Sequence, residues 1–400
     1  MVNPSKKIKN LPPYLFGAID ILKARAFSKK LDVIDLGMGN PDLPTPEPII
    51  ERLIDTVKHH PRTHRYPQAK GMPKFRRAIS EWYKRRFSVK LNPENEVVAL
   101  IGSKEGISNF MHAFLDPGDI VLVPSPCYPV HYNSVILAGG TPYLMPLLEE
   151  NKYLPVLEDI PEKVAKKSKI MILNYPNNPT TAVIEDLNFL KEVIKFARKY
   201  NIIVLYDNAY SEITYDGYIA PSFLQIEGAK DVGVEFHSFS KTFNMAGWRV
   251  GWACGNSEIL SYLAKYKSYV DYGVPTFIQL AGVKALELEK EVKETVREYE
   301  RRIDIFIGKL KKVNWQIKKP KATMYLWTKI PRPYSGMPSL EFSELLIETT
   351  GIAVAPGSGF GNYGEGYIRI AMVTHYKRFH DAYLRLRKFL QKNKKGMSNE

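Results

Sequence analysis

The sequence predicts an α/β protein built around a doubly wound, mostly parallel β-sheet. Short apolar runs recur along the chain, and each has the length and composition of a buried parallel strand. They are residues 97–101, 120–123, 170–173 and 202–206. Between the last two, residues 185–200 place apolar side chains at helical spacing, with acidic residues first and basic residues last. Such alternation of strands and helices is typical of a sheet covered by helices on both faces.

The length and composition fit a globular protein with more than one domain. The chain has 400 residues, which exceeds one ordinary hydrophobic core and fits two or three domains. Hydrophobic residues make up 44% and charged residues 25%, so the chain can bury a large core. Cys127 and Cys254 are the only cysteines, too few for a disulfide framework, so we expect a reducing, cytoplasmic location.

The charge distribution and the lack of long apolar runs exclude some partners. The formal net charge is +15, but basic residues are spread along the chain beside acidic ones without a nucleic-acid motif. No stretch reaches the roughly 18 apolar residues of a membrane-spanning helix, and residues 1–16 lack the apolar core of a signal peptide. We therefore expect neither a nucleic-acid partner nor a membrane partner.

A long charged helical pattern separates two predicted domains. Residues 281–312 contain no glycine between Gly282 and Gly308 and predict one bridging helix. In the smaller domain we expect strands over 324–327 and 367–373, a helix over 340–349, a closing helix that ends near Leu390, and a frayed segment 391–400. The expected division is an N-terminal arm with part of the small domain (1–45), a large domain (46–285) and the small domain (286–400).

Several common catalytic motifs are absent or misplaced. Residues 359–364 match G-x-G-x-x-G, but a dinucleotide-binding motif follows a strand and opens a helix, whereas this segment leads into the predicted strand 367–373. The motifs G-x-x-x-x-G-K-[ST], H-E-x-x-H and G-x-S-x-G do not occur. We therefore exclude metallohydrolase and serine-hydrolase chemistry and expect no metal site.

Polar segments follow the predicted strands, where doubly wound sheets bind their ligands. Residues 102–106 (GSKEG) follow the first strand and open a helix, a geometry that suits a phosphate. Residues 174–180 (NYPNNPT) follow the third strand and present amide side chains on a proline-fixed loop. Residues 207–210 (DNAY) offer a carboxylate and a phenol after the fourth strand. Taken alone, each segment is more often a helix cap or a turn.

The segment 237–242 (HSFSKT) sets one lysine among hydroxyl groups. A lysine is usually a solvated surface charge, but Lys241 lies in a stretch of Phe, Ser, Met, Ala and Trp, with Arg249 eight residues later. Burial near Arg249 would lower the pKa of Lys241 and make its amine a nucleophile toward carbonyl groups.

The order of these motifs resembles the fold-type I, pyridoxal-phosphate-dependent aminotransferases of classes I and II. The matching segments are, in chain order, L-G-M-G-N-P-D, Y-P-Q-A-K-G, G-S-K-E-G, P-C-Y-P, P-N-N-P-T, D-N-A-Y, S-F-S-K, G-W-R-V-G-W and Y-I-R-I-A. The resemblance covers essentially the whole chain. It implies a large domain with a doubly wound, mostly parallel sheet, a smaller α/β domain, and pyridoxal 5'-phosphate as the cofactor.

The resemblance implies a role for each polar residue around the cofactor ring. Lys241 would form the Schiff base with the cofactor and move the α-proton of the substrate. Asp207 would keep the ring nitrogen protonated, so that the ring can accept electrons. Tyr210 and Asn178 would hydrogen-bond the ring oxygen, and Tyr128 would stack on the ring.

The phosphate contacts follow from the same resemblance. Ser103 and Lys104 would bind the phosphate through backbone N–H groups, Ser238 and Ser240 through their hydroxyl groups, and Arg249 through its guanidinium group. Charge-assisted hydrogen bonds of this kind are the strong ones.

The resemblance also implies the substrate contacts and a shared site. Arg369 would bind the α-carboxylate, together with Asn178 and the backbone at Gly39, and Tyr14 would lie at the entrance. Any arginine in a strand could instead form a salt bridge, but the apolar neighbours of Arg369 favour an inward role. Tyr66 would reach the phosphate of the neighbouring subunit, which implies a homodimer.

Two proline bonds in this region are predicted to be cis. The loop 174–180 must turn sharply to present Asn178, so we expect a cis bond before Pro179. For the same reason we expect a cis bond between Ser125 and Pro126, ahead of Tyr128.

The substrate is predicted from finer resemblance within the family. The motifs G-M-G-N-P-D, I-G-S-K-E-G, N-P-T-T, M-A-G-W-R and K-S-Y-V-D-Y-G look closest to bacterial glutamate-pyruvate (alanine) aminotransferases. Nearly as close are the LL-diaminopimelate aminotransferases, through P-P-Y-L-F and D-V-G-V-E-F-H-S. We expect ping-pong transfer from L-alanine to 2-oxoglutarate, with an LL-diaminopimelate or a broad-specificity aspartate/aromatic aminotransferase as the alternative.

One departure from the family bears on the substrate. Residues 265–279 contain no arginine, although dicarboxylate-specific aspartate enzymes often carry one in the matching region, so a dedicated aspartate enzyme is disfavoured. His112 is a candidate for the distal carboxylate of glutamate, although a packed histidine is the more common case. A pyridoxal-dependent lyase or decarboxylase and a catalytically inactive relative are rival classes, and the intact set Lys241, Asp207, Arg249 and Arg369 disfavours the inactive relative.

Overall fold

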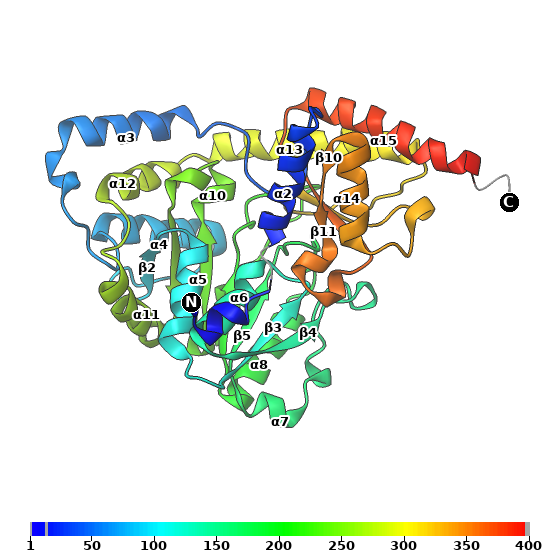
Figure 1. Ribbon diagram of the computed structural model, residues 1–400. Helices are drawn as coiled ribbons and strands as arrows, with labels where there is room; N and C mark the ends of the chain where they lie inside the picture. Colours follow the sequence, from blue (N-terminus) through cyan, green and yellow to red (C-terminus); the bar gives the residue numbers. More distant parts are fainter. Residues whose placement is uncertain (1, 13–14, 397–400) are drawn as a thin grey trace.

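The central layer of the protein is a seven-stranded β-sheet. A computed structural model describes residues 2–12 and 15–396 and has helices on both faces of this sheet (Figure 1). The strand order is β2-β8-β7-β6-β5-β3-β4. In that order the strands span Val97–Leu100, Gly251–Gly255, Gly233–Ser238, Ile203–Asp207, Ser168–Asn174, Ile120–Ser125 and Thr141–Pro146. The predicted doubly wound α/β sheet is confirmed.

One strand breaks the parallel arrangement. Strands β4, β3, β5, β6 and β7 pair in parallel, whereas β8 is antiparallel to both β7 and β2. The connection from β7 to β8 contains only short helical turns and no helix that could cross a face of the sheet, so β8 runs back beside β7. The prediction of a parallel strand over 97–101 was therefore wrong, because β2 pairs with the glycine-flanked β8, which the sequence pattern did not predict.

Alternate residues of each strand face opposite layers of helices. In β3, Val121 and Val123 belong to one hydrophobic cluster and Leu122 to the other, as the two-residue period of a strand requires. The first cluster includes residues of α5 (Ser103–Phe114), α6 (Pro129–Ala138) and α11 (Ser257–Val270). The second includes residues of α4 (Pro73–Phe87), α8 (Asn188–Tyr200) and α12 (Thr276–Ala285).

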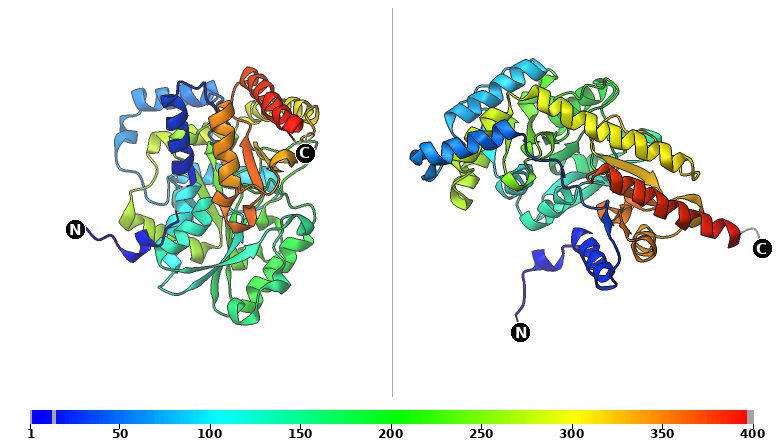
Figure 2. Two further views of the ribbon diagram at one scale, coloured as in Figure 1. Left: turned by 45° about the vertical axis from the view of Figure 1, so that its right-hand side comes forward. Right: turned by 90° about the horizontal axis from the view of Figure 1, so that it is seen from above.

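A further hydrophobic cluster joins residues from both ends of the chain. It surrounds an antiparallel sheet of β11 (Ala355–Pro356), β12 (Tyr367–Ala371) and β9 (Tyr325–Lys329). Strand β1 (Ile34–Asp35) pairs in parallel with β10 (Ile352–Ala353), which ties the N-terminal segment to this part of the protein. Helix α14 (Ser339–Thr350) packs against α2 (Leu15–Ser28), and α13 (Glu289–Lys311) lies beside α15 (Tyr376–Gly396) (Figure 2).

The remaining helices are shorter or peripheral. They are α1 (Lys6–Lys9), α3 (Glu47–His59), α7 (Glu162–Ala165), α9 (Ala229–Val232) and α10 (Phe239–Thr242). The 3₁₀ helices are η1 (Pro61–His64), η2 (Glu149–Asn151), η3 (Leu157–Asp159), η4 (Phe223–Gln225), η5 (Ala246–Trp248), η6 (Arg332–Tyr334), η7 (Gly357–Phe360) and η8 (Asn362–Gly364). Within the described ranges, no helix is long and apolar enough to cross a membrane. The rejected G-x-G-x-x-G segment forms η7 and η8 and leads into β12.

Two helix predictions were wrong at their boundaries. The single helix expected over 281–312 is interrupted between α12 and α13, where Leu286 and Leu288 both pack on the core of the large sheet. In one continuous helix these two side chains would lie on nearly opposite faces. Helix α15 continues to Gly396 and does not end near Leu390, since lysine and glutamine are good helix formers and polarity alone does not end a helix.

The buried Arg302 connects three segments around α13. Its side chain is 2% exposed and donates hydrogen bonds to Asp42 Oδ1 (2.7 Å), Glu298 Oε1 (2.8 Å) and the carbonyl oxygen of Met372 (3.1 Å). The neighbouring Arg301 pairs with the same Glu298 but is 48% exposed. Arg301 and Arg302 therefore pair with the same carboxylate, Arg301 from an exposed position and Arg302 from a buried one.

Replacement of Arg302 by Met is predicted to lower the free energy of unfolding by about 2 to 3 kcal/mol, because the partly buried Asp42 carboxylate loses its pair with Arg302 and Glu298 keeps the exposed Arg301 in place of two arginines. Arg301→Met is the matched control and should cost less than about 1 kcal/mol, as exposed pairs do. Urea denaturation of both variants measures the difference. Equal losses would contradict the role assigned to Arg302.

Candidate active site

A cavity of about 210 Å³ lies at the carboxyl ends of β5, β6 and β7. The last residues of these strands, Asn174, Asp207 and Ser238, all line it. The sequence-predicted residues that it brings together are Gly39, Ser103, Lys104, Tyr128, Asn178, Asp207, Tyr210, Ser238, Ser240, Lys241, Arg249 and Arg369. The edge of the sheet thus gathers side chains that are far apart in the sequence, as a doubly wound fold predicts.

Asp207 is a buried carboxylate at the end of β6. It is 4% exposed, and its Oδ2 lies 3.0 Å from Nε2 of the fully buried His131. Asn174 Nδ2 donates to the Asp207 carbonyl oxygen at 2.8 Å, which fixes the backbone there. The buried Oδ1 has no hydrogen-bond partner among residues 2–12 and 15–396. A buried acceptor of this kind costs free energy unless a ligand supplies the donor.

His131 is a site residue that the sequence analysis missed. It lies on α6, three residues after Tyr128, and the two rings are 5.9 Å apart. Residues three apart lie on one face of a helix. That spacing was the only available signal, because nothing in the sequence ties residue 131 to Asp207.

Lys241 lies on the short helix α10, and its amine enters the cavity. The hydroxyl of Ser238 caps this helix by accepting a hydrogen bond from the Ser240 N–H (3.1 Å). The Lys241 Nζ donates to the Gly39 carbonyl oxygen at 2.7 Å. Burial lowers the pKa of Lys241, and the positive charges of Arg369 and Arg249 lower it further, against an opposing effect of Tyr325. The amine is therefore more readily uncharged and nucleophilic than that of an exposed lysine.

One end of the cavity is built to bind an anion. Helix α5 begins at Ser103, with Gly102 before it at φ 78°, and Ser103 and Lys104 in its first turn line the cavity. The N–H groups and the dipole at the N-terminus of a helix favour an anion. A Cβ at Gly102 would lie 2.7 Å from Arg249 Nη2, so glycine permits the guanidinium group to approach the helix end. The hydroxyls of Ser238 and Ser240 line the same cavity.

Arg369 lies on β12 and is 1% exposed. Its Nη1 donates to Asn178 Oδ1 (2.7 Å) and its Nη2 to the Gly37 carbonyl oxygen (2.9 Å). The guanidinium group lies 4.2 Å from the centre of the Tyr325 ring and 4.7 Å from that of Phe360. The oxygens of Asn178 and Gly37 are neutral, so neither of these two hydrogen bonds cancels the positive charge of the arginine. The predicted inward orientation is confirmed.

Tyr325 on β9 is a second residue that the sequence analysis missed. Its hydroxyl lies 3.0 Å from that of Tyr210, and a Cβ at Gly39 would collide with its ring. Burial alone would raise the pKa of Tyr325, but the positive charges of Lys241 and Arg369 outweigh burial and lower it. Burial raises the pKa of Tyr210 well above its usual value. The strand 324–327 was predicted, but its pairing with β12 beside Arg369 was not.

The loop that carries Asn178 has the predicted geometry. Both predicted bonds, before Pro179 and before Pro126, are cis, and so is the bond between Tyr175 and Pro176, which was not predicted. The Asn174 side chain accepts a hydrogen bond from the Asn178 N–H at 3.0 Å and so holds the loop on the end of β5.

Three predicted candidates lie elsewhere or are not described. Tyr66 is 84% exposed and packs against Tyr272, with ring centres 4.8 Å apart. His112 stacks against Tyr266 at 5.9 Å, outside the cavity, and burial lowers its pKa. Tyr14 lies outside the described residues. Of the residues between 265 and 279, Lys267 is fully buried and pairs with Glu105 (2.6 Å) and Asp271 (3.1 Å).

Comparison with known proteins identifies the family. The family model of "Aminotransferase class I and II" matches residues 31–378, so the chain belongs to the class I and II aminotransferases. Relatives include the LL-diaminopimelate aminotransferase of Moorella thermoacetica, 49% identical over 97% of this chain and 98% of that protein. The enzyme of the same name from Aquifex aeolicus is 49% identical over 96% of this chain and 98% of that protein.

The solved structures agree with this assignment. Substrate-bound BacF from Bacillus subtilis has a TM-score of 0.93 and 38% identity, and the match covers 98% of both chains. The fold is that of the fold-type I aminotransferases, as the sequence motifs implied. The protein is thus a pyridoxal-phosphate-dependent enzyme that acts on amino acids and 2-oxo acids.

The residues of the cavity fit pyridoxal 5'-phosphate. The cofactor aldehyde needs an amine, its ring nitrogen needs a carboxylate and its phosphate needs several donors. Lys241 supplies the amine, and Asp207 has a buried oxygen without a partner in the described part of the chain. The helix α5 N–H groups, two serine hydroxyls and Arg249 lie together at one end.

Lys241 is predicted to be the lysine that the cofactor labels. Incubation with pyridoxal phosphate and reduction with borohydride should modify Lys241, while Lys241→Ala should lose the label and the visible absorbance band. The variant should still bind the cofactor through Arg249 and Ser238, as equilibrium dialysis can measure. Lys195→Ala, at an exposed lysine on α8, is the control and should keep the label. Near-normal turnover and labelling of Lys241→Ala would show that another lysine carries the chemistry.

Proposed function

We propose that the protein transfers the amino group of LL-2,6-diaminopimelate to 2-oxoglutarate in a ping-pong reaction. The observation that carries this proposal is similarity over nearly the whole chain, at 47% to 49% identity, to relatives named LL-diaminopimelate aminotransferases. The arrangement of Lys241, Asp207 and Arg369 supports the transamination chemistry itself.

L-Alanine, the amino donor expected from the sequence motifs, becomes the second candidate. The motifs that favoured it, G-M-G-N-P-D and M-A-G-W-R, include Gly39 and Arg249, which line the cavity. Groups that bind the cofactor and the α-carboxylate are needed for every amino donor. These motifs therefore carry little information about the distal end of the substrate, whereas similarity over the whole chain includes that region.

Binding in the proposed reaction is divided between two ends of the cavity. At one end, Arg249, Ser238, Ser240 and the first N–H groups of α5 would bind the cofactor phosphate. At the other, the Arg369 guanidinium group would bind the substrate α-carboxylate in a planar, two-point contact. Asn178 already bonds Arg369 Nη1 at 2.7 Å and would orient that group. The substrate Cα–H bond would then lie between these anchors, near Lys241.

Proton transfer would depend on Lys241 and Asp207. Pyridoxal phosphate, when bound, supplies an aldehyde that reacts with amines and a ring that accepts the electrons released at the substrate Cα. The Lys241 Nζ, with its lowered pKa, would accept and return the α-proton as a general base and acid. The buried Asp207 would hold a proton on the ring nitrogen through its free oxygen, and His131 would orient that carboxylate.

We propose a homodimer in which Tyr66 completes the site of the other subunit. Tyr66 lies outside the cavity of its own chain, is 84% exposed and packs against Tyr272, which is 63% exposed. Tyr269, three residues before Tyr272, is 85% exposed. A surface of exposed aromatic rings is typical of a face that another protein covers. A second copy of this chain would bury these rings and receive Tyr66 at its phosphate end.

We propose the domain division that the sequence predicts, with domains over residues 1–45, 46–285 and 286–400. We also propose that the protein is cytoplasmic. Separate hydrophobic clusters around the large sheet and around β9, β11 and β12 support the division. Cys127 and Cys254 are both free and buried, which fits a reducing compartment.

Replacement of Arg369 by Lys is predicted to raise the KM of both amino and keto substrates by about tenfold or more, because it keeps the charge but loses the planar fork. Cofactor affinity should stay unchanged. Arg249→Lys is the reciprocal control and should weaken cofactor binding more than substrate binding. Steady-state kinetics at saturating cofactor and a cofactor titration separate the two effects. Unchanged KM values in Arg369→Lys would show that another residue binds the substrate α-carboxylate.

The amino donor is tested by comparing kcat/KM for LL-diaminopimelate and L-alanine with 2-oxoglutarate as the acceptor. The proposal predicts that LL-diaminopimelate exceeds alanine by about tenfold or more, a margin of roughly 1.4 kcal/mol in transition-state binding. L-Aspartate should be poor, since residues 265–279 contain no arginine. A higher kcat/KM for alanine would show that the protein is an alanine aminotransferase. It would not contradict the assignment to the aminotransferases.

A further inference from the structure

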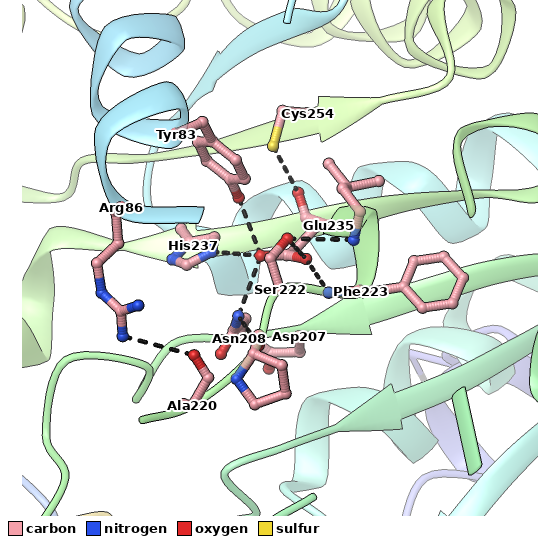
Figure 3. Close-up of polar contacts among 12 residues, drawn as sticks. Tyr83, Arg86, Asp207, Asn208, Ala220, Ser222, Phe223, Glu235, His237 and Cys254 are labelled. Atoms are coloured by element: carbon pink, nitrogen blue, oxygen red, sulfur yellow. Dashed lines mark hydrogen bonds and ion pairs between the residues drawn. The ribbon is translucent and has the colours of Figure 1, made fainter. Parts of the chain in front are cut away.

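A buried carboxylate, Glu235, lies outside the cavity, on the face of the large sheet that packs against α4. It is in the middle of β7 and fully buried, and its side chain is surrounded by donors from four segments of the chain (Figure 3). Its Oε1 accepts hydrogen bonds from Tyr83 Oη (3.0 Å), Asn208 Nδ2 (3.0 Å) and His237 Nε2 (2.7 Å). Its Oε2 accepts from Ser222 Oγ (2.7 Å) and the Phe223 N–H (2.8 Å).

These contacts hold Glu235 in its ionised form. Burial alone would raise the pKa of Glu235, but the hydrogen bonds from His237, Ser222 and Asn208 outweigh burial and lower it. An ionised carboxylate is a pure acceptor, and every group around it donates. A buried charge is costly to fold around, and apolar residues of similar size often replace it without loss of stability. Stability alone therefore does not account for a carboxylate at this position.

Two of the donors lie directly beside residues of the cavity. Asn208 follows Asp207, and its own N–H donates to the Phe236 carbonyl oxygen on β7 at 2.9 Å. His237 precedes Ser238 in the strand that leads to Lys241, and its ring stacks on Trp252 of β8 with centres 4.8 Å apart. Glu235 therefore connects the segment that contains Asp207 with the segment that contains Ser238 and Lys241.

We infer that Glu235 is a positioning residue, which fixes Asp207 and Lys241 relative to each other through Asn208 and His237. Neither Asp207 nor Lys241 contacts the other through a described hydrogen bond, so their relative position depends on the strands that carry them. Small displacements of reacting groups have large effects on rate, of about 100-fold for roughly 1 Å. This inference rests on the roles proposed above for Asp207 and Lys241.

The test compares Glu235→Gln with Tyr83→Phe in the holoenzyme. Glutamine has nearly the same shape, but its NH₂ group would face donors on one side of the network and force a rearrangement. Tyr83→Phe removes one donor to the same carboxylate but leaves the contacts to Asn208 and His237. Asn208→Ala is a third variant, which removes the Asn208 Nδ2 contacts with Glu235 Oε1 (3.0 Å) and the Pro221 carbonyl oxygen (3.2 Å), leaves the contact of His237 with Glu235, and remains informative if Glu235→Gln fails to fold.

The inference predicts that Glu235→Gln and Asn208→Ala lower kcat by about tenfold or more with KM within about threefold, because the reacting groups and not the substrate anchors are displaced. The pH midpoint of the cofactor's visible absorbance should shift in Glu235→Gln. Tyr83→Phe should keep kcat and that midpoint while losing thermal stability.

Two results would overturn the inference. The first is an unchanged kcat and absorbance midpoint in Glu235→Gln or in Asn208→Ala, which would leave Glu235 with a structural role only. The second is an equal loss of kcat in Tyr83→Phe. Failures of the proposals on which the inference rests are recognised separately. A wrong amino donor would appear as a higher kcat/KM for alanine than for LL-diaminopimelate in the unsubstituted enzyme, and a wrong role for Lys241 would appear as retained activity in Lys241→Ala.

Discussion

Concentration of positive charge at one edge of the sheet is the constraint on which the site depends. Lys241, Arg369 and Arg249 line one cavity, and both arginines lower the pKa of Lys241. Cations held close together repel one another, and Arg369 is also buried, so the arrangement is costly unless hydrogen bonds or anions compensate it. Backbone and amide oxygens at Gly39, Gly37 and Asn178 compensate part of this cost. A phosphate and a carboxylate are the ligands that such a cavity favours.

The fold makes this concentration of charge possible because it gathers residues from distant segments. The cavity lies where β5, β6 and β7 end, where α5 begins, and where β12 brings in Arg369. Asp207 is the carboxylate of this cationic site, and it is kept between His131 and the backbone contact from Asn174. Strands β6 and β7 also position the hydrogen bonds around Glu235 on the opposite face of the sheet (Figure 3). The geometry of the site and the packing of the core therefore depend on the same strands.

Features encoded by local patterns were predictable from the sequence, and features set by pairing across the fold were not. The large sheet, the position of Lys241 among hydroxyl groups and the cis bonds before Pro126 and Pro179 follow from strand patterns and motifs. His131 and Tyr325 carry no local mark of function, since their partners Asp207 and Tyr210 are 76 and 115 residues away in sequence. The glycine-flanked β8 and the turn before α13 depend on tertiary packing, which overrides local propensity.

The most direct test of this account is a crystal structure of the protein with pyridoxal phosphate and LL-diaminopimelate. The account predicts the phosphate between the N-terminus of α5 and Arg249, the ring nitrogen against Asp207 Oδ1, and one substrate carboxylate on Arg369. A cofactor ring that does not contact Asp207, or a phosphate that does not contact Arg249, would contradict it.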